Sequence, residues 1–292
     1  MTTTEIAPAV HPGSWYADWQ HEDHAEFFDA RARLSRADLI RNLEMFNDVR
    51  LLQAHVSRAA AGTLVEVGCA TGEMCRYVAL RYPALRYVGV DISEPAIVRA
   101  REKHPRGRFV VGHPGVPLLE TLRRHGVAQP PELLYAKDVV HHQIQPFEFL
   151  EELVTSATHA VILRLRTRDV GATVLDPEQS CQYHYNGWMP YIVMNLEEII
   201  ARIRQAAPQS EMVVCRHHMV LGGRLNRFLP KACYLPDTGT AETAVGVFLR
   251  SPRPGAVTIE DRVDGQASRS PDFRLARLAG RVWRSLTRSQ RS

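Results

Sequence analysis

The stretch Thr63-Leu64-Val65-Glu66-Val67-Gly68-Cys69-Ala70-Thr71-Gly72 joins a short apolar run to a turn of small residues. The apolar residues before the turn suit a buried parallel strand. The glycines and alanine of the turn let the backbone approach a ligand closely before a helix begins near Glu73. This stretch therefore predicts a strand that ends in a ligand-binding loop.

A second apolar run, Tyr87-Val88-Gly89-Val90, ends in Asp91, about nineteen residues after Gly72. This separation is expected when an acid at a strand end meets the ribose of a nucleotide in a βαβ unit. We therefore expect the two strand ends to face one ligand.

The two stretches together resemble the class I, Rossmann-like methyltransferases that depend on S-adenosylmethionine (SAM), small-molecule type. Their first motif is an acid followed by Gly-x-Gly-x-Gly, and residues Glu66 to Gly72 match it with Ala70 in the place of the middle glycine. The dinucleotide fingerprint Gly-x-Gly-x-x-Gly fits less well, because the third glycine falls one residue early. A purely structural turn without a ligand stays open as the alternative.

The resemblance implies that SAM is the cofactor, with its methionine part in the loop and its ribose hydroxyls on Asp91. The family usually has an acid for the adenine amino group after the third strand, whereas this chain has Gly112-His113. A neutral imidazole could accept from that amine, or could point away and leave the contact to a backbone carbonyl. The expected cofactor contacts come from Glu66, Gly68, Cys69, Ala70, Gly72, Asp91, Ile92, His113 and Asp138.

Composition limits the class of protein. The chain has 292 residues, and its 45% hydrophobic content is ample for a core. Five scattered cysteines without a Cys-x-x-Cys pair argue against a disulfide framework or a zinc ribbon, and suit the cytoplasm. We expect neither a signal peptide nor a membrane span, since no apolar run approaches the required length.

Alternating strand and helix patterns continue to about Arg250. They predict an α/β fold, a doubly wound, mostly parallel seven-stranded sheet with helices on both faces. Seven is the strand number of the methyltransferase class. We expect three parts: an N-terminal segment and helical lid (1–60), a SAM-binding methyltransferase domain (61–250), and a linker with a basic amphipathic helix (251–292).

Apolar residues between positions 18 and 60 recur at helical spacing. We expect these helices to lie across the mouth of the first strand, as an N-terminal helical lid. Trp15, Tyr16 and Trp19 either belong to this lid or only pack the helices against the body.

The acceptor is expected beyond the carboxyl ends of the fourth and fifth strands. There, Val139-Val140-His141-His142 resembles the fourth motif of small-molecule methyltransferases and differs from the Asn/Asp-Pro-Pro-Tyr/Phe motif of amino-methylating nucleic-acid enzymes. Methyl transfer needs alignment with the sulfonium, and a hydroxyl acceptor also needs a base. His141, His142 and His184 are the candidate bases, although the pair can equally serve packing and helix capping.

An insertion from Arg168 to Asn195 is too long for an ordinary connection. Its aromatic and amide side chains suit a cap over a planar or sugar-like acceptor, or else bury against the insertion's own body. The substrate-binding candidates are Tyr183, Tyr185, Asn186, Trp188 and Arg166.

No metal is predicted. Asp138 and Asp169 occupy the places where catechol-type O-methyltransferases hold magnesium. Val170 replaces the expected asparagine, and Arg166 and Arg168 would repel a cation.

The sequence thus predicts a methyltransferase that acts on a small-molecule acceptor, at a hydroxyl of a natural product or glycan precursor. N- or carboxyl-methylation and a catalytically idle SAM-fold binding protein are the alternatives. No nucleic-acid partner is expected, because the excess of basic residues lies in the tail after Ser268. That basic amphipathic tail can lie on an anionic membrane, or dock on the body or on a second subunit of a homodimer.

Overall fold

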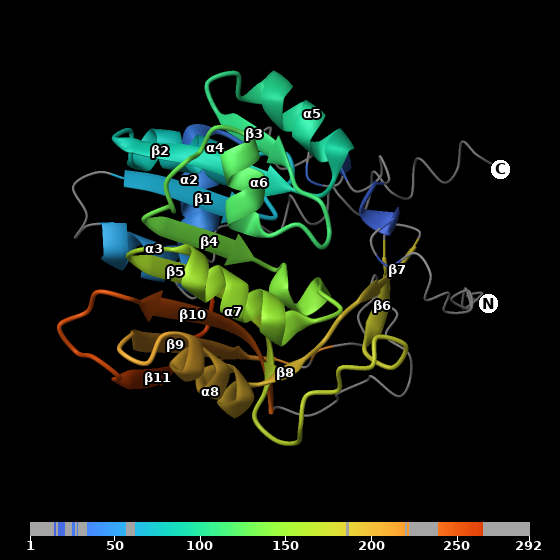
Figure 1. Ribbon diagram of the computed structural model, residues 1–292, viewed down its shortest axis with the longest axis vertical. Helices are drawn as coiled ribbons and strands as arrows, with labels where there is room; N and C mark the ends of the chain where they lie inside the picture. The colour runs from blue at the N-terminus through green and yellow to red at the C-terminus, as the bar shows by residue number, and fades with distance from the viewer. Residues whose placement is uncertain are drawn as a thin grey trace.

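The computed structural model describes residues 34–56, 62–184, 187–219 and 239–264, together with Leu221 and isolated positions between 15 and 28. Its centre is a mixed, mostly parallel sheet with helices on both faces, so the expected α/β class is confirmed (Figure 1). The expected C-terminal helix after Pro271 lies outside the described residues.

The sheet has the strand order β11-β9-β10-β5-β4-β1-β2-β3, with β8 paired to β5. Only β10 runs antiparallel to its neighbours. Nine strands therefore stand in this described sheet where seven were expected, and the additional ones are β8 and β11. The bounds are β1 Gly62–Val67, β2 Leu85–Asp91, β3 Arg108–Val111, β4 Leu133–Lys137, β5 Ala160–Arg168, β8 Met194–Asn195, β9 Glu211–His218, β10 Thr240–Phe248 and β11 Val257–Asp261.

Alternating side chains of the central strands bury both faces of the sheet. On one face, Val65 and Leu134 pack under α6, α7 and α8, the helices nearest the viewer in Figure 1. On the other face, Leu64 and Tyr135 pack under α2, α3 and α4, while α5 covers Phe109 of β3. The helices span α2 Arg36–Glu44, α3 Asn47–Val56, α4 Glu73–Arg81, α5 Glu94–Lys103, α6 Leu118–Arg124, α7 Pro146–Ser156 and α8 Leu196–Ala206.

Two expectations for the ends of the chain need correction. The helices α2 and α3 do not lie across the mouth of β1, because they bury Leu39, Leu43 and Leu52 against the face of the sheet. The stretch expected to be a linker contains β11, which hydrogen-bonds along β9 as a parallel edge strand. In the described residues, α2 and α3 thus cover one face of the sheet, and β11 extends the sheet at its edge.

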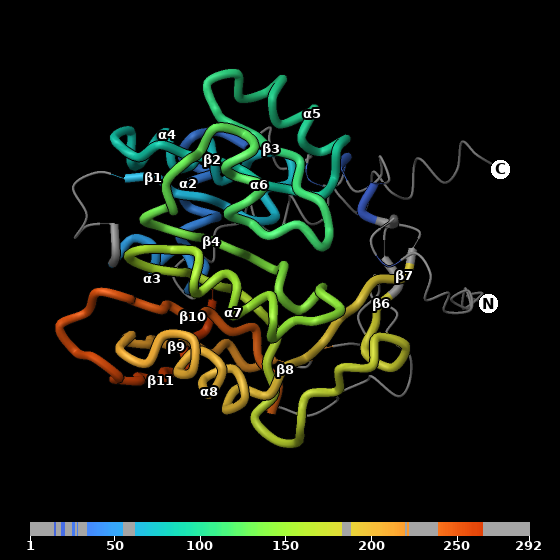
Figure 2. The backbone as a smooth tube through the Cα atoms, viewed as in Figure 1, coloured from blue at the N-terminus to red at the C-terminus, as the bar shows by residue number. Residues whose placement is uncertain are grey.

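The insertion leaves the sheet at the carboxyl end of β5 and returns to it at β8 (Figure 2). It folds back on itself as a hairpin of β6 (Cys181–His184) and β7 (Gly187–Pro190). None of the described helices is long and apolar enough to cross a membrane. Four cysteines, Cys69, Cys75, Cys181 and Cys215, are free and buried.

Candidate active site

The loop between β1 and α4 has three residues in the left-handed backbone region: Gly68 at φ 78°, Ala70 at φ 44° and Gly72 at φ 85°. A Cβ on Gly68 would lie 2.2 Å from Cγ2 of Val139, so only glycine fits there. Ala70 holds a conformation that favours glycine, at a cost of about 1 kcal/mol. The middle position of the motif thus requires a positive φ angle, which Ala70 adopts in this chain.

Asp91 joins the two strand-end turns. Its Oδ2 accepts from the backbone N–H of Ala70 at 2.8 Å, and its Oδ1 accepts from the backbone N–H of Ser93 at 2.8 Å. The side chain is 8% exposed, and burial raises its pKa although the backbone hydrogen bonds oppose that shift. The ends of β1 and β2 are therefore fixed to each other, while the predicted contact of Asp91 with a ribose stays a prediction.

Glu66 lies in β1, two residues before Gly68, and the Tyr87 hydroxyl donates to its Oε2. Burial raises the pKa of Glu66 to about 8, against the lowering effects of Tyr87 and Lys137. Cys69 beside it is also buried, which raises the pKa of its thiol well above the usual value. Both side chains are therefore buried at the end of β1.

The 3-10 turn η2 (Ala17–Gln20) reaches both sides of this loop. Trp19 packs edge-on against His142 with ring centroids 5.1 Å apart, while Gln20 Nε2 donates to the carbonyl oxygen of Ile92 at 2.5 Å. His142 follows β4 and Ile92 follows β2, and β1 runs between those two strands. The turn therefore crosses the carboxyl end of β1.

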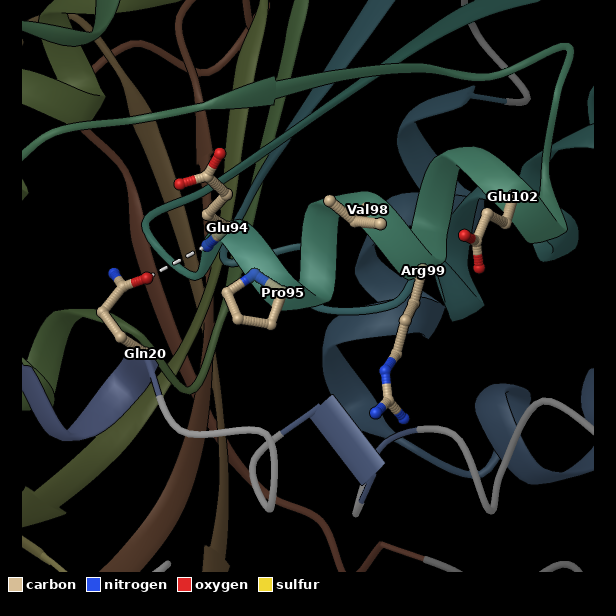
Figure 3. A pocket seen from close by; sticks show the side chains of 6 residues that line it. All are labelled: Gln20, Glu94, Pro95, Val98, Arg99 and Glu102. Carbon is tan, nitrogen blue, oxygen red and sulfur yellow. Dashed lines mark hydrogen bonds between the residues drawn. The ribbon is translucent and has the colours of Figure 1, made fainter.

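The described part of the chain also has a surface hollow of about 550 Å³ beside η2 (Figure 3). Apart from Gln20, it is lined only by α5, with the side chains Glu94, Pro95, Val98, Arg99 and Glu102. Gln20 Oε1 accepts from the backbone N–H of Glu94 at 3.2 Å along one edge of the hollow (Figure 3). None of the strand-end residues faces it.

The histidine pair forms the short turn η3 (Val140–His142) after β4, and both side chains are buried. His142 Nδ1 lies 2.7 Å from the carbonyl oxygen of Pro190 in β7. A carbonyl oxygen only accepts, so Nδ1 carries the proton and Nε2 is the basic nitrogen of the neutral ring. Tyr191 packs on both rings, at 5.2 Å from His141 and 5.7 Å from His142.

Among the candidate substrate-binding residues of the insertion hairpin, the structure describes the side chain of Trp188. Trp188 is buried with Trp15 and Cys181 in one apolar cluster, so its ring packs between the insertion and the N-terminal segment. His184 closes β6, but its side chain and those of Tyr183, Tyr185 and Asn186 lie outside what the structure describes. The insertion hairpin and Trp15 are therefore in contact with each other.

Arg166 and Asp138, expected to touch substrate and cofactor, are paired with each other at 2.7 Å. Arg166 also contacts Glu242 at 3.2 Å and donates from Nε to the Tyr191 hydroxyl at 3.0 Å. The arginines hold the pKa of Asp138 well below its usual range, although burial pushes it upward. His113, the expected adenine partner, is exposed.

A buried ionic network, which the sequence did not predict, continues from Arg166 to Arg164. Arg164 is 5% exposed and contacts four carboxylates: Asp48 of α3, Asp138, Glu242 of β10 and Asp264 beyond β11. The Tyr135 hydroxyl donates to Asp48 on the far side. The alternation of Arg164 and Arg166 in an apolar strand was the only local sign of this network.

Asp138 and Asp169, at the positions compared above with magnesium ligands, are each paired with basic side chains. Asp169 contacts Arg216 and His218, each at 3.0 Å. His217, Glu242 and Asp264 bring one ligand atom each within 4.8 Å of one another, the one such cluster among the described residues. Both of its carboxylates already pair with Arg164, so the cluster is explained as part of the network.

Comparisons with known proteins agree with the motif. Residues 65–159 match the family model described as a methyltransferase domain, which confirms the resemblance drawn from the Glu66 to Gly72 loop and Asp91. A trans-aconitate 2-methyltransferase of Rhodopseudomonas palustris (strain HaA2) is 26% identical over 155 residues, 52% of this chain and 51% of the relative. The chain thus spans about half the length of that relative.

Two further likenesses are more limited. A trans-aconitate 2-methyltransferase of Paracidovorax citrulli (strain AAC00-1) is 36% identical over 70 residues, 22% of this chain and 27% of the relative. The solved structure of the plantazolicin methyltransferase BpumL, in complex with a pentazolic desmethylPZN analog and SAH, has a TM-score of 0.48 at 16% identity. That alignment covers 81% of this chain and 94% of the other.

Proposed function

From the match of residues 65–159 to a methyltransferase domain, we propose that the chain transfers the methyl group of SAM to an oxygen of a small molecule. The observation that carries the proposal is the junction of Asp91 with the Gly68 to Gly72 loop. The Asp91 oxygens accept from the backbone N–H groups of Ala70 and Ser93, and a carboxylate has further lone pairs for a ribose hydroxyl.

SAM then lies over the carboxyl ends of β1 and β2. The loop backbone from Gly68 to Gly72 takes its methionine part, and η2 closes over it as the lid. Trp19 and Gln20 support this role, because they contact His142 after β4 and Ile92 after β2, the strands on either side of β1. Glu66, Cys69 and Ile92 complete the cofactor wall in this proposal, and His113, being exposed, contributes its backbone rather than its ring to the adenine.

The acceptor lies beside His142, where the insertion meets the end of β4. With its proton held at Nδ1 by Pro190, His142 presents the basic nitrogen Nε2 and accepts the proton of an acceptor hydroxyl. His141 and His184 remain the other candidates, and Tyr183, Tyr185, Asn186 and Trp188 are the proposed substrate-binding residues of the cap.

A hydroxyl acceptor fits this site better than a carboxylate, although the relatives are named for trans-aconitate. The two buried arginines near the site, Arg164 and Arg166, are already matched by four carboxylates. They offer no excess positive charge to a polyanion, and removing ionic partners from a buried arginine is costly. A carboxylate also needs no base at neutral pH.

We propose that η2 of the N-terminal segment (1–60) forms the lid, that residues 61–250 with their cap (168–195) form the catalytic domain, and that the tail (251–292) adds β11 to the same sheet. The free, buried cysteines support a cytoplasmic location. A small molecule, and not a nucleic acid, is the proposed partner. Contact of the tail with a membrane or a second subunit also stays a proposal.

Calorimetric titration with SAM and with S-adenosylhomocysteine tests the cofactor site. Asp91→Ala should weaken both by about tenfold to a hundredfold, the equivalent of one or two charge-assisted hydrogen bonds. Glu102→Ala, in the hollow of Figure 3, is the matched control and should leave both affinities unchanged. Binding that is lost in Glu102→Ala but kept in Asp91→Ala would reject the strand-end site. Turnover of SAM with a pool of hydroxylated acceptors separates the enzyme from a catalytically idle binding protein.

A further inference from the structure

Arg166 contacts both chain segments that form the hydrogen bond between His142 and Pro190. Its Nη1 donates to Asp138 Oδ1 at 2.7 Å, and Asp138 lies four residues before His142. Its Nε donates to the hydroxyl of Tyr191 at 3.0 Å, and Tyr191 directly follows Pro190. One buried guanidinium therefore ties together the donor segment and the acceptor segment of that hydrogen bond.

The two tied segments have few alternative positions. Asp138 adopts φ 59°, and its backbone N–H donates to the Arg164 carbonyl at 2.9 Å, so the chain turns sharply from β4 into η3. On the other side, the backbone N–H of Ile192 donates to the His141 carbonyl at 2.8 Å. A displacement of Tyr191 or Asp138 is thus transmitted directly to the His142 ring.

The third contact of the guanidinium explains why it is an arginine. Its Nη2 lies 3.2 Å from Glu242 Oε1, so Nε, Nη1 and Nη2 each meet a different protein partner. A planar guanidinium holds three partners at fixed angles, whereas the ammonium of lysine is a single point of charge. With three of its nitrogens engaged in this way, Arg166 acts on the acceptor through its neighbours.

We propose that Arg166 is a positioning residue that keeps His142 in the tautomer protonated on Nδ1 and directs its Nε2 toward the acceptor. The inference rests on the proposed function for its catalytic consequence, but the tautomer is a property of the protein alone. Tyr191 transmits the effect on the Pro190 side and Asp138 transmits it on the His142 side.

Two variants test the tie without removing a buried charge. Tyr191→Phe keeps the ring against both histidines and deletes only the hydroxyl that accepts from Arg166. Arg166→Lys keeps the positive charge for Asp138 and Glu242 but lacks the forked geometry. The matched control is Arg164→Lys, since Arg164 lies on the same face of β5 and also meets Asp138 and Glu242, whereas the Tyr191 hydroxyl accepts from Arg166.

The first readout is the nitrogen NMR spectrum of protein labelled in its histidines, with the His142 signals identified by their loss in His142→Gln. We expect the Nδ1-protonated tautomer in the wild type and in Arg164→Lys, and a shift toward the Nε2-protonated tautomer in Tyr191→Phe and Arg166→Lys. An unchanged tautomer in Tyr191→Phe overturns the proposal, and so does an equal shift in Arg164→Lys. If Arg166→Lys fails to fold, Tyr191→Phe decides.

The second readout is turnover with an acceptor found in the screen described above. Tyr191→Phe and Arg166→Lys should lower kcat about tenfold to a hundredfold, because a base that is misaligned loses part of its catalytic effect. The affinity for S-adenosylhomocysteine should stay within about twofold, since the loop is untouched. A wild type without turnover rejects the proposed function and leaves the tautomer result standing on its own. A shifted tautomer with unchanged kcat rejects the catalytic consequence.

Discussion

The two halves of the active-site edge are built in different ways. At β1 and β2 the geometry comes from the main chain: positive φ angles in the loop and backbone N–H groups that hold Asp91. At β5 and β10 it comes from side chains, with Arg164 and Arg166 surrounded by acids of distant segments. A site built from the backbone suits a cofactor that is the same in all enzymes of one fold. A site built from side chains can be altered by single substitutions to suit a different acceptor.

The largest effect is expected on the side-chain half. Asp48→Ala removes a carboxylate that receives the Tyr135 hydroxyl and faces Arg164 from α3. Because one member of a buried ionic network is lost, the free energy of unfolding should fall by roughly 3 to 5 kcal/mol. Urea denaturation measures it. Glu120→Ala, in the exposed pair with Arg124, is the control and should change stability by less than about 1 kcal/mol. Equal losses in the two variants would show that the network is not a special support.

A smaller effect on stability is expected at Glu66 of β1. Burial raises the pKa of this carboxyl group to about 8. The unfolded chain has the ordinary pKa of 4.5, so between that pH and 8 the folded state keeps a proton that the unfolded state has lost. Stability should therefore fall as the pH rises through this window, by about 1.4 kcal/mol for each pH unit inside it.

Glu66→Gln should flatten that dependence and raise the melting temperature at about pH 8, since glutamine has no proton to lose and still accepts from Tyr87. Melting curves of both proteins at several pH values between about 5 and 8 provide the measurement. A wild-type melting temperature that rises over this range would contradict the assignment of a raised pKa.

The smallest effect sharpens the backbone side. Ala70→Gly relieves a φ of 44° at the middle position of the motif. Glycine adopts this region without strain, but it also adds freedom to the unfolded chain, so we expect a gain of no more than about 1 kcal/mol. Gly68→Ala gives the opposite sign, because its Cβ would meet Val139. Chemical denaturation gives the free energy of unfolding of both variants. Changes of the same sign in Ala70→Gly and Gly68→Ala would contradict the view that backbone conformation determines the loop.

The cofactor half could be predicted from the sequence because its contacts follow from short spacings. A strand, a glycine-rich turn and an acid about twenty residues later define a βαβ unit, and Asp91 then meets Ala70 by construction. The alternating strand and helix patterns also predicted the doubly wound, mostly parallel sheet, which the structure confirms. They did not predict β11, since five polar and apolar residues after a Pro-Gly turn carry little strand signal.

The acceptor half could be predicted only in part. The histidine pair and the insertion were placed correctly at the end of β4 and beside β5. The sequence could not show that Arg166 is matched by Glu242 and Tyr191, because these contacts join strands that pair only in the folded sheet. Two arginines alternating in an apolar strand indicate that buried partners exist, but not which acids they are.

The span of the Arg164 network has a consequence for how the chain folds. The backbone N–H of Asn47 donates to Asp264 across 217 positions of sequence, and Arg164 contacts acids on both sides of that link. On the ribosome, the β1 to β2 unit can close as soon as Asp91 has emerged, since its bonds are local. The charge of Arg164 is fully matched only after Asp264 leaves the exit tunnel, because contacts of long sequence separation form last. In a nascent chain, the Asp91 and Ala70 contact can therefore form well before the four carboxylates around Arg164 are all present.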